Sequence, residues 1–165
     1  MHFEPGAATG NVVGLPLRLP APQDASPAAA VQRRQFILDS SMCAPDGRSA
    51  ALSRAHPMMC INGKTHDMAR IDEEVKLGTS EIWQVFSVGM AHPFHIHGAS
   101  FRILSINGEP PPAHVAGWKD VVLVDDKVEL VVRFDRPASR RSPFMYHCHI
   151  LEHEDAGMMG QYICT

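Results

Sequence analysis

Residues 146–159 read Tyr-His-Cys-His-Ile-Leu-Glu-His-Glu-Asp-Ala-Gly-Met-Met, and residues 92–98 read His-Pro-Phe-His-Ile-His-Gly. Six of the ten histidines of the chain lie in these two stretches. One cysteine there has a histidine on each side, and a methionine follows the last histidine by five residues. Thiolate, thioether and imidazole groups are the donors that copper sites in proteins use. The two stretches therefore indicate copper binding.

Strand geometry separates the donors of the later stretch. Successive side chains of a β-strand point to opposite faces of the sheet. If residues 145–149 form a strand, His147 and His149 leave one face and Cys148 leaves the other. The cysteine and its two neighbours would then serve different sites.

The earlier stretch divides in the same way. His95 and His97 share a parity, whereas His92 has the opposite one, provided that Pro93 leaves the strand regular. These parities predict two separate sets of donors. The first set is Cys148, His92, His153 and Met158, and the second set is His95, His97, His147 and His149.

The first set combines one thiolate, two imidazoles and one thioether. Two histidines and a cysteine with a weak, long axial methionine form the blue-copper electron-transfer arrangement. Zinc also accepts cysteine and histidine, but a thioether is a poor zinc ligand and the chain has no paired Cys-x-x-Cys site. The spacing from His153 favours Met158 as the ligand, and its neighbour Met159 as a core residue.

The second set contains only imidazoles, which suit copper, zinc or iron. Cys148 is covalently linked to His147 on one side and to His149 on the other. Adjacent residues rise only about 3.3 Å along a strand. An electron that reaches the thiolate therefore has a short covalent route to the second set.

These motifs resemble the C-terminal copper motifs of the multicopper oxidases. They look most like those of the bacterial copper-efflux oxidase and laccase branch, and the similarity covers residues 34–165. Shorter matches add to it: Ile61-Asn62-Gly63, Phe101-Arg102-Ile103-Leu104-Ser105 and Ala116-Gly117-Trp118-Lys119-Asp120.

The resemblance implies a ligand role for each donor. It implies a type 1 copper at His92, Cys148, His153 and axial Met158, a type 2 ligand at His95, and type 3 ligands at His97, His147 and His149. In the family, the type 1 copper takes single electrons from a reducing substrate, such as a phenol or a cuprous or ferrous ion. The cysteine passes them to a trinuclear copper site that reduces dioxygen to water.

The chain departs from the family in one respect. The trinuclear cluster of these oxidases takes eight histidines, and half of them come from two His-x-His motifs of an N-terminal domain. The remaining histidines here do not have that spacing, and they are His2, His56, His66 and His114. We therefore expect one complete type 1 site and half of a type 2/type 3 site. Another domain, another chain or an oligomer, as in the trimeric small laccases, would supply the rest.

We expect carboxylates next to the metal-binding histidines, because a metal-bound histidine usually donates its other ring N–H to a carboxylate or a carbonyl. The acids close to the motifs are Asp120, Glu152, Glu154 and Asp155. We assign Asp120 to the catalytic surroundings and Glu154 to proton delivery to oxygen. The alternative for Glu154 is a solvated loop acid.

Two further functions compete with the oxidase interpretation. The first is a stand-alone blue-copper electron carrier that uses the first set only. The second is a copper-binding or storage module without turnover. A pure carrier has no need for the all-histidine set, which argues against the first.

Short stretches of strand-forming residues between turn signals predict an all-β fold, a Greek-key sandwich or barrel. The resemblance implies the cupredoxin type of this architecture. Val128, Leu130, Val132 and Phe134 alternate and should face inward. The expected strands are 34–40, 58–61, 80–88, 94–97, 100–106, 120–124, 127–134, 144–149 and 160–164, with a loop over 41–56.

Residues 1–31, rich in Pro and Ala, predict an extended linker before a domain at 32–165.

The length and net charge of the chain limit the classes of partner that we expect. The chain has 165 residues and a formal net charge of −3, which suits one domain with a buried core. We expect no nucleic-acid partner, because there is no basic stripe, and no membrane span. No signal peptide is visible. The resemblance implies a periplasmic or other extracytoplasmic setting.

Three cysteines remain besides Cys148, namely Cys43, Cys60 and Cys164. An odd number cannot pair completely within one chain. Free buried thiols and a disulfide between Cys43 and Cys60 are both open.

Overall fold

The computed structural model describes residues 26–41 and 59–165. Most of the expected linker (residues 1–25) and of the expected loop at 41–56 lies outside these ranges, as does Cys43. Within the described residues, no helix is long and apolar enough to cross a membrane.

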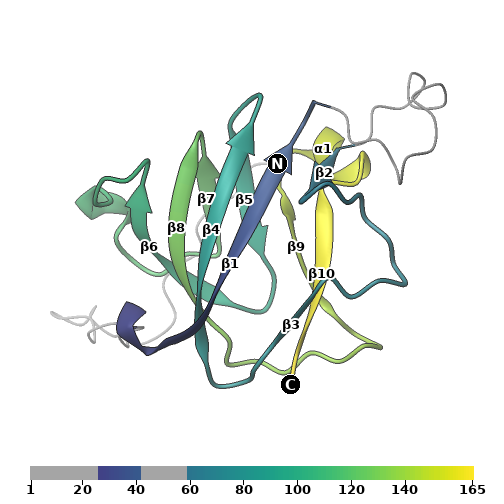
Figure 1. The fold of residues 1–165 in the computed structure, drawn as a ribbon, viewed down its shortest axis with the longest axis horizontal. Coiled ribbons are helices and arrows are strands. Elements are labelled where there is room, and N and C mark those ends of the chain that lie inside the picture. The colour runs from purple at the N-terminus through teal and green to yellow at the C-terminus, as the bar shows by residue number, and fades with distance from the viewer. Residues whose placement is uncertain (1–25, 42–58) are drawn as a thin grey trace, which may run out of the picture.

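The described residues form ten strands in two five-stranded sheets that pack face to face (Figure 1). The first sheet has the order β2 (Cys60–Ile61), β1 (Ala30–Asp39), β4 (Ser80–Val88), β8 (Lys127–Arg133) and β6 (Ser100–Ile106). The second has the order β3 (Glu73–Val75), β10 (Met159–Cys164), β9 (Phe144–Cys148), β5 (His92–Ile96) and β7 (Val121–Val124). The predicted all-β class is confirmed.

The alternation predicted for residues 127–134 is also confirmed. Val128, Leu130, Val132 and Phe134 are all buried between the sheets. For β4, Trp83 marks the face that points between the sheets. Its ring belongs to the buried aromatic core and lies 4.4 Å, centroid to centroid, from that of a phenylalanine on the neighbouring β1.

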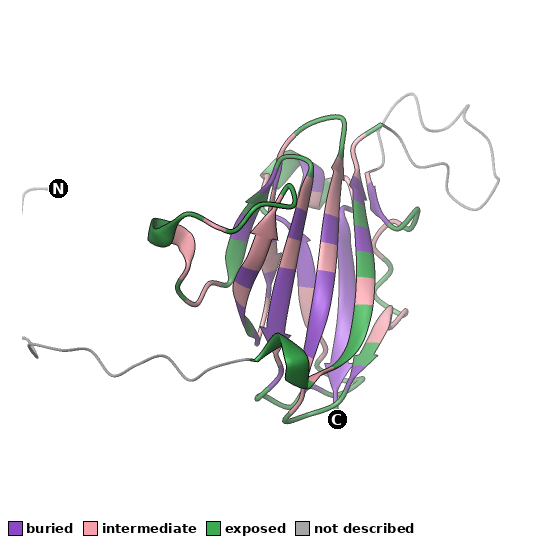
Figure 2. Ribbon diagram, turned by 60° about the vertical axis from the view of Figure 1, so that its left-hand side comes forward, coloured by how far each residue is buried: buried purple, intermediate pink, exposed green. Residues whose placement is uncertain are grey.

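Aromatic side chains fill the space between the sheets, and Figure 2 shows buried segments running along the strands. The rings of this core make contacts with centroid distances of 4.4 to 6.2 Å. They belong to Phe36, Trp83, Phe94, Phe134, Tyr146 and Tyr162. Tyr146 and Tyr162 come from the two strands that lead into and out of the later histidine stretch, so the core directly supports that stretch.

A buried ion network, the Arg34 network, joins the two sheets. Arg34 on β1 donates from Nε and Nη2 to the carboxylate of Glu81 on β4, at 2.6 and 3.0 Å. It also donates to Glu73 on β3 and, at 2.7 Å, to the carbonyl of Glu74. Trp83 Nε1 donates to the same Glu81 carboxylate at 2.9 Å, so this buried acid is fully partnered.

Several elements differ from the sequence-based expectations. Strand β1 begins at Ala30, four residues before the predicted start, and pairs parallel with β4. The short strand β3 was not predicted, and it pairs parallel with β10. A five-residue helix, α1 (Leu151–Asp155), follows β9, and 3₁₀ turns occupy Pro27–Ala29 and Ala113–Val115.

The described cysteines are of two kinds. Cys60 is disulfide-bonded, whereas Cys148 and Cys164 are free and buried. The Cys43 half of the pairing considered from the sequence lies outside the described residues.

Candidate metal sites

His92, Cys148 and His153 meet where β5 and β9 approach α1. His92 is the first residue of β5, Cys148 is the last residue of β9, and His153 lies on α1. The two strands are paired in one sheet, with Phe94 opposite Cys148. The short helix folds back at the end of β9, so Cys148 and His153 lie close to each other and to His92, which is distant from both in sequence.

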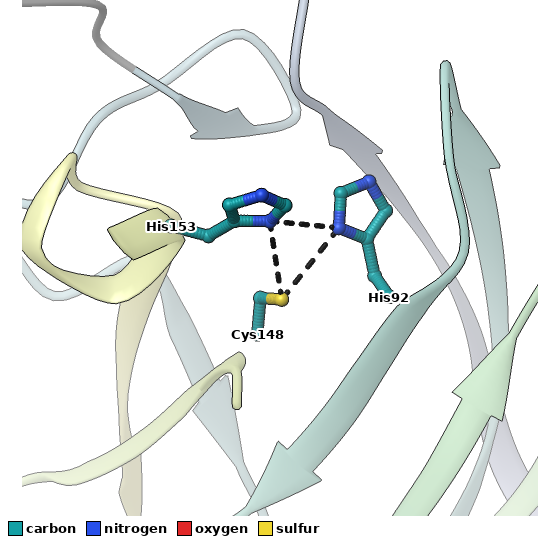
Figure 3. Close-up of side chains that lie close together, drawn as sticks. All are labelled: His92, Cys148 and His153. Carbon is teal, nitrogen blue, oxygen red and sulfur yellow. Dashed lines mark hydrogen bonds between the residues drawn. The ribbon is translucent and has the colours of Figure 1, made fainter. Parts of the chain in front are cut away.

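The three donor atoms of this set form a small triangle (Figure 3). Cys148 Sγ lies 3.6 Å from His92 Nδ1 and 3.5 Å from His153 Nδ1, and the two nitrogens are 3.1 Å apart. First-row metal–donor bonds of about 2.0 Å to nitrogen and about 2.3 Å to sulfur, around a trigonal centre, separate donors by roughly 3.5 Å. The triangle therefore fits one ion of that size.

Burial favours the uncharged forms of Cys148 and His92. It raises the pKa of the Cys148 thiol. Burial also lowers the pKa of His92, and the neighbouring His153 acts in the same direction. A neutral imidazole is already the ligand form, whereas the thiol must release its proton when a metal binds. A metal ion bound by this triangle would therefore replace the thiol proton.

Met158 lies beside this triangle along the backbone. Its N–H donates to the carbonyl of His153 at 2.9 Å, and its carbonyl accepts from the N–H of Cys148 at 3.2 Å. Met158 is fully buried and belongs to the same core cluster as Cys148. Met159 instead pairs with His147 across β9 and β10. Of the two methionines, Met158 is the one held between two members of the first set.

The histidine-only set gathers on the other face of the same sheet. One ring nitrogen from each of His95, His97 and His147 lies within 4.8 Å of the others. The ring of His149 is 5.4 Å from that of His95 and 5.3 Å from that of His147, centroid to centroid. The structure thus separates the histidines into the two groups that strand parity predicts, with Cys148 on the opposite face.

Hydrogen bonds fix which ring nitrogens point into this set. A carbonyl only accepts, so His95 donates from Nδ1 to the Asp120 carbonyl at 2.7 Å. His147 likewise donates from Nδ1 to the carbonyl of Cys148 at 2.9 Å. Their Nε2 atoms remain for a metal, and His147 Nε2 lies 3.0 Å from His97 Nε2. Burial lowers the pKa of His97 and of His147, which favours the neutral ligand form.

The acids near the motifs take different positions. The backbone carbonyl of Asp120, rather than its carboxylate, contacts His95. Glu154 Oε2 lies 3.5 Å from Nδ1 of His147. Glu152 and Asp155 are exposed. Glu154 is therefore the acid that the structure brings to the histidine-only set.

A hollow of about 440 Å³ opens beside the histidine-only set. Its lining includes His95, His97, Asp120, Arg136 and Phe144. Several of these side chains are polar or charged, so the hollow suits a polar occupant rather than a buried apolar ligand.

The sequence model of the multicopper oxidases matches residues 38–165. The chain belongs to the multicopper oxidase family. Membership implies copper binding, and the two-sheet architecture is the cupredoxin-type sandwich of these oxidases.

Two curated relatives are similar to part of this multicopper oxidase chain. Multicopper oxidase mco of Staphylococcus haemolyticus (strain JCSC1435) is 46% identical over 112 residues, 64% of this chain and 24% of the relative. Cell division protein FtsP of Photorhabdus laumondii subsp. laumondii is 42% identical over 103 residues, 62% of this chain and 22% of the relative.

Solved structures that resemble this chain are also multicopper oxidases. The laccase-like multicopper oxidase CueO from the lignin-degrading bacterium Ochrobactrum sp. is 47% identical, with a TM-score of 0.78, over 96% of this chain and 36% of that one. A metallo-oxidase from Campylobacter jejuni is 32% identical, with a TM-score of 0.68, over 93% of this chain and 34% of that one. The chain thus spans about a quarter of the sequence relatives and about a third of the solved structures.

Proposed function

We propose that this chain is the electron-accepting domain of a copper oxidase. In this proposal His92, Cys148, His153 and axial Met158 hold a type 1 copper, His95 is a type 2 ligand, and His97, His147 and His149 are type 3 ligands. Copper bound at the two sets would supply one-electron oxidation of a phenol or a cuprous or ferrous ion, and reduction of dioxygen to water.

One observation supports this function over the others. Strand β9 carries one donor of each set, because Cys148 faces the first set while His147 beside it faces the second. The Cys148 carbonyl also accepts from Nδ1 of His147 at 2.9 Å. The thiolate is therefore linked to the second set by a covalent path and by a hydrogen bond.

The histidine-only set would be half of a cluster. It offers four imidazoles, and the hollow of about 440 Å³ beside it leaves room for side chains from elsewhere. We infer that a domain or chain with His-x-His motifs, in the same polypeptide or in a hetero-oligomer, completes it. An extracytoplasmic location is part of this proposal, with residues 32–165 as the copper-binding domain and residues 1–31 as its linker.

Glu154 would hold the proton that oxygen reduction consumes. Its carboxylate lies 3.5 Å from Nδ1 of His147, on the side of the ring opposite the Nε2 atom that faces His97. Its side chain is 30% exposed, so it can exchange protons with solvent while touching the site. Asp120 would orient His95 through its carbonyl.

A chimera tests the proposal. This chain would replace the matching C-terminal part of the Ochrobactrum sp. enzyme, with which it is 47% identical. We expect a blue protein that consumes oxygen with a phenol, and a colourless, inactive one when Cys148→Ser is introduced. A folded blue chimera without oxygen uptake would favour a stand-alone electron carrier, and copper binding without a redox couple would favour a storage module.

A further inference from the structure

His97 is the one member of the histidine-only triplet that lies outside a strand. His95 is inside β5 and His147 is inside β9, whereas β5 ends at Ile96. His95 and His147 also have their rings fixed by bonds from Nδ1 to carbonyls. Among the described residues, none accepts a hydrogen bond from Nδ1 of His97. Apart from its contacts with the His95 and His147 rings, the direction of the His97 ring therefore depends on its backbone.

That backbone is held from both sides. The N–H of His97 donates to the carbonyl of Met145 on β9 at 2.8 Å. The carbonyl of His97 accepts from the hydroxyl of Tyr162 on β10 at 2.5 Å. Tyr162 is fully buried, and burial raises its pKa, so the phenol remains a donor over the working range of a protein.

Neighbouring rings keep the tyrosine in place. Tyr162 lies opposite Phe144 in the pairing of β10 with β9, and their ring centroids are 5.7 Å apart. The Phe144 ring in turn covers Gly98, where an added Cβ would collide with it. Rings from Trp83 and Phe134 pack on the other sides of Tyr162. The Tyr162 ring is thus held in the core, and its hydroxyl donates to the carbonyl of His97.

We propose that Tyr162 is a positioning residue for the histidine-only set. Its hydroxyl fixes the carbonyl of His97, and through it the direction of the imidazole toward His147. The metal role of the set rests on the proposed function, whereas the hydrogen bond does not. Sequence motifs do not reveal this residue, because it follows the last copper motif and its hydroxyl reaches His97 across 65 residues of sequence.

The first test uses the metal-free chain. Tyr162→Phe removes only the hydroxyl, and Tyr146→Phe is the matched control on β9. NMR would follow the carbonyl ¹³C shift of His97 and the cross-relaxation between the His97 and His147 rings. We expect Tyr162→Phe to move the shift and to weaken the ring contact, and Tyr146→Phe to change neither. These signals report native geometry, so a loss of stability alone would leave them in place.

The second test uses the copper-loaded chimera. Loss of a neutral hydrogen bond corresponds to about tenfold in an equilibrium constant. We expect Tyr162→Phe to weaken binding of the non-blue copper by about that factor, with the blue absorption unchanged. Unchanged NMR signals, or the same changes in Tyr146→Phe, would overturn the positioning role. If the parent chimera took up no copper, the proposed function would fail while the NMR comparison still decided the role of Tyr162.

Discussion

Cys148 is the residue on which both donor sets depend. Its side chain completes the first triangle, and its carbonyl orients His147 in the second set. A serine at this position keeps the backbone carbonyl and removes only the thiolate. The two roles of the residue can therefore be separated by one substitution.

We predict that Cys148→Ser abolishes the blue absorption of the copper-loaded chain without unfolding it. The oxygen of serine is a much harder donor than the thiolate that a blue site requires. Visible absorption and bound copper would be measured together. Cys164→Ser is the control, because Cys164 is also free and buried but pairs with Val75 and Ala138, at the far end of β10 from Met159. Retention of the blue colour in Cys148→Ser would contradict the assignment of the first set.

Glu154→Gln tests proton delivery in the oxidase chimera. A group that transfers protons in the reaction contributes about 10²–10⁴-fold to rate. We expect oxygen uptake to slow by about 100-fold, with the blue colour retained, since the amide keeps the shape but cannot release a proton at neutral pH. Glu152→Gln, on the exposed face of the same helix, should be close to the parent. Equal oxygen uptake in the two variants would rule out the role of Glu154.

At the scale of elements, the turn after β5 determines where the second set forms. Gly98 has a φ of +66° and lies under the Phe144 ring. A side chain there meets two separate penalties, the left-handed backbone and the collision. Gly108 also has a positive φ, +85°, but an added Cβ would meet nothing within 4 Å.

Gly98→Ala should therefore destabilise the chain more than Gly108→Ala. The left-handed conformation costs about 1–2 kcal/mol for a residue with a Cβ. Overpacking adds about 1–3 kcal/mol at Gly98 only. Urea unfolding of both variants would give the free energies of unfolding. Equal losses of unfolding free energy in the two variants would show that the Phe144 ring moves aside without destabilising the chain.

At the scale of the whole molecule, the Arg34 network ties one sheet to the other. Glu81 on β4 is only 2% exposed and has Arg34 as its cationic partner. The same guanidinium reaches β3, at the edge of the second sheet. Removing the cation would leave a buried carboxylate without a counter-charge, which is far more costly than losing a surface pair.

We expect Arg34→Met to lower the free energy of unfolding by about 3–5 kcal/mol. Arg33→Met is the matched control on the same strand, because Arg33 pairs with Glu129 at the surface with 59% of its side chain exposed. Its loss should cost less than about 1 kcal/mol. Calorimetry and urea unfolding would compare the two. Similar losses would mean that the Arg34 network does not connect the sheets energetically.

The sequence predicted the fold class and the separation of Cys148 from His147 because both depend on local alternation. The inward face of residues 127–134 and the opposite directions of His147 and Cys148 follow from the period of two along a strand. The parallel pairing of β1 with β4 and the short strand β3 depend on contacts between distant segments, which alternation does not encode. The contact of Tyr162 with His97 was missed for the same reason.

A copper titration of the purified chain tests the central claim most directly. Visible absorption, bound copper equivalents and oxygen uptake on an added phenol would be followed together. A complete first set and half of a second set predict one copper per chain, an intense blue colour and no oxygen uptake by the chain alone. More than one copper per chain with steady oxygen consumption would contradict the account, because the chain would then assemble a working cluster without outside histidines.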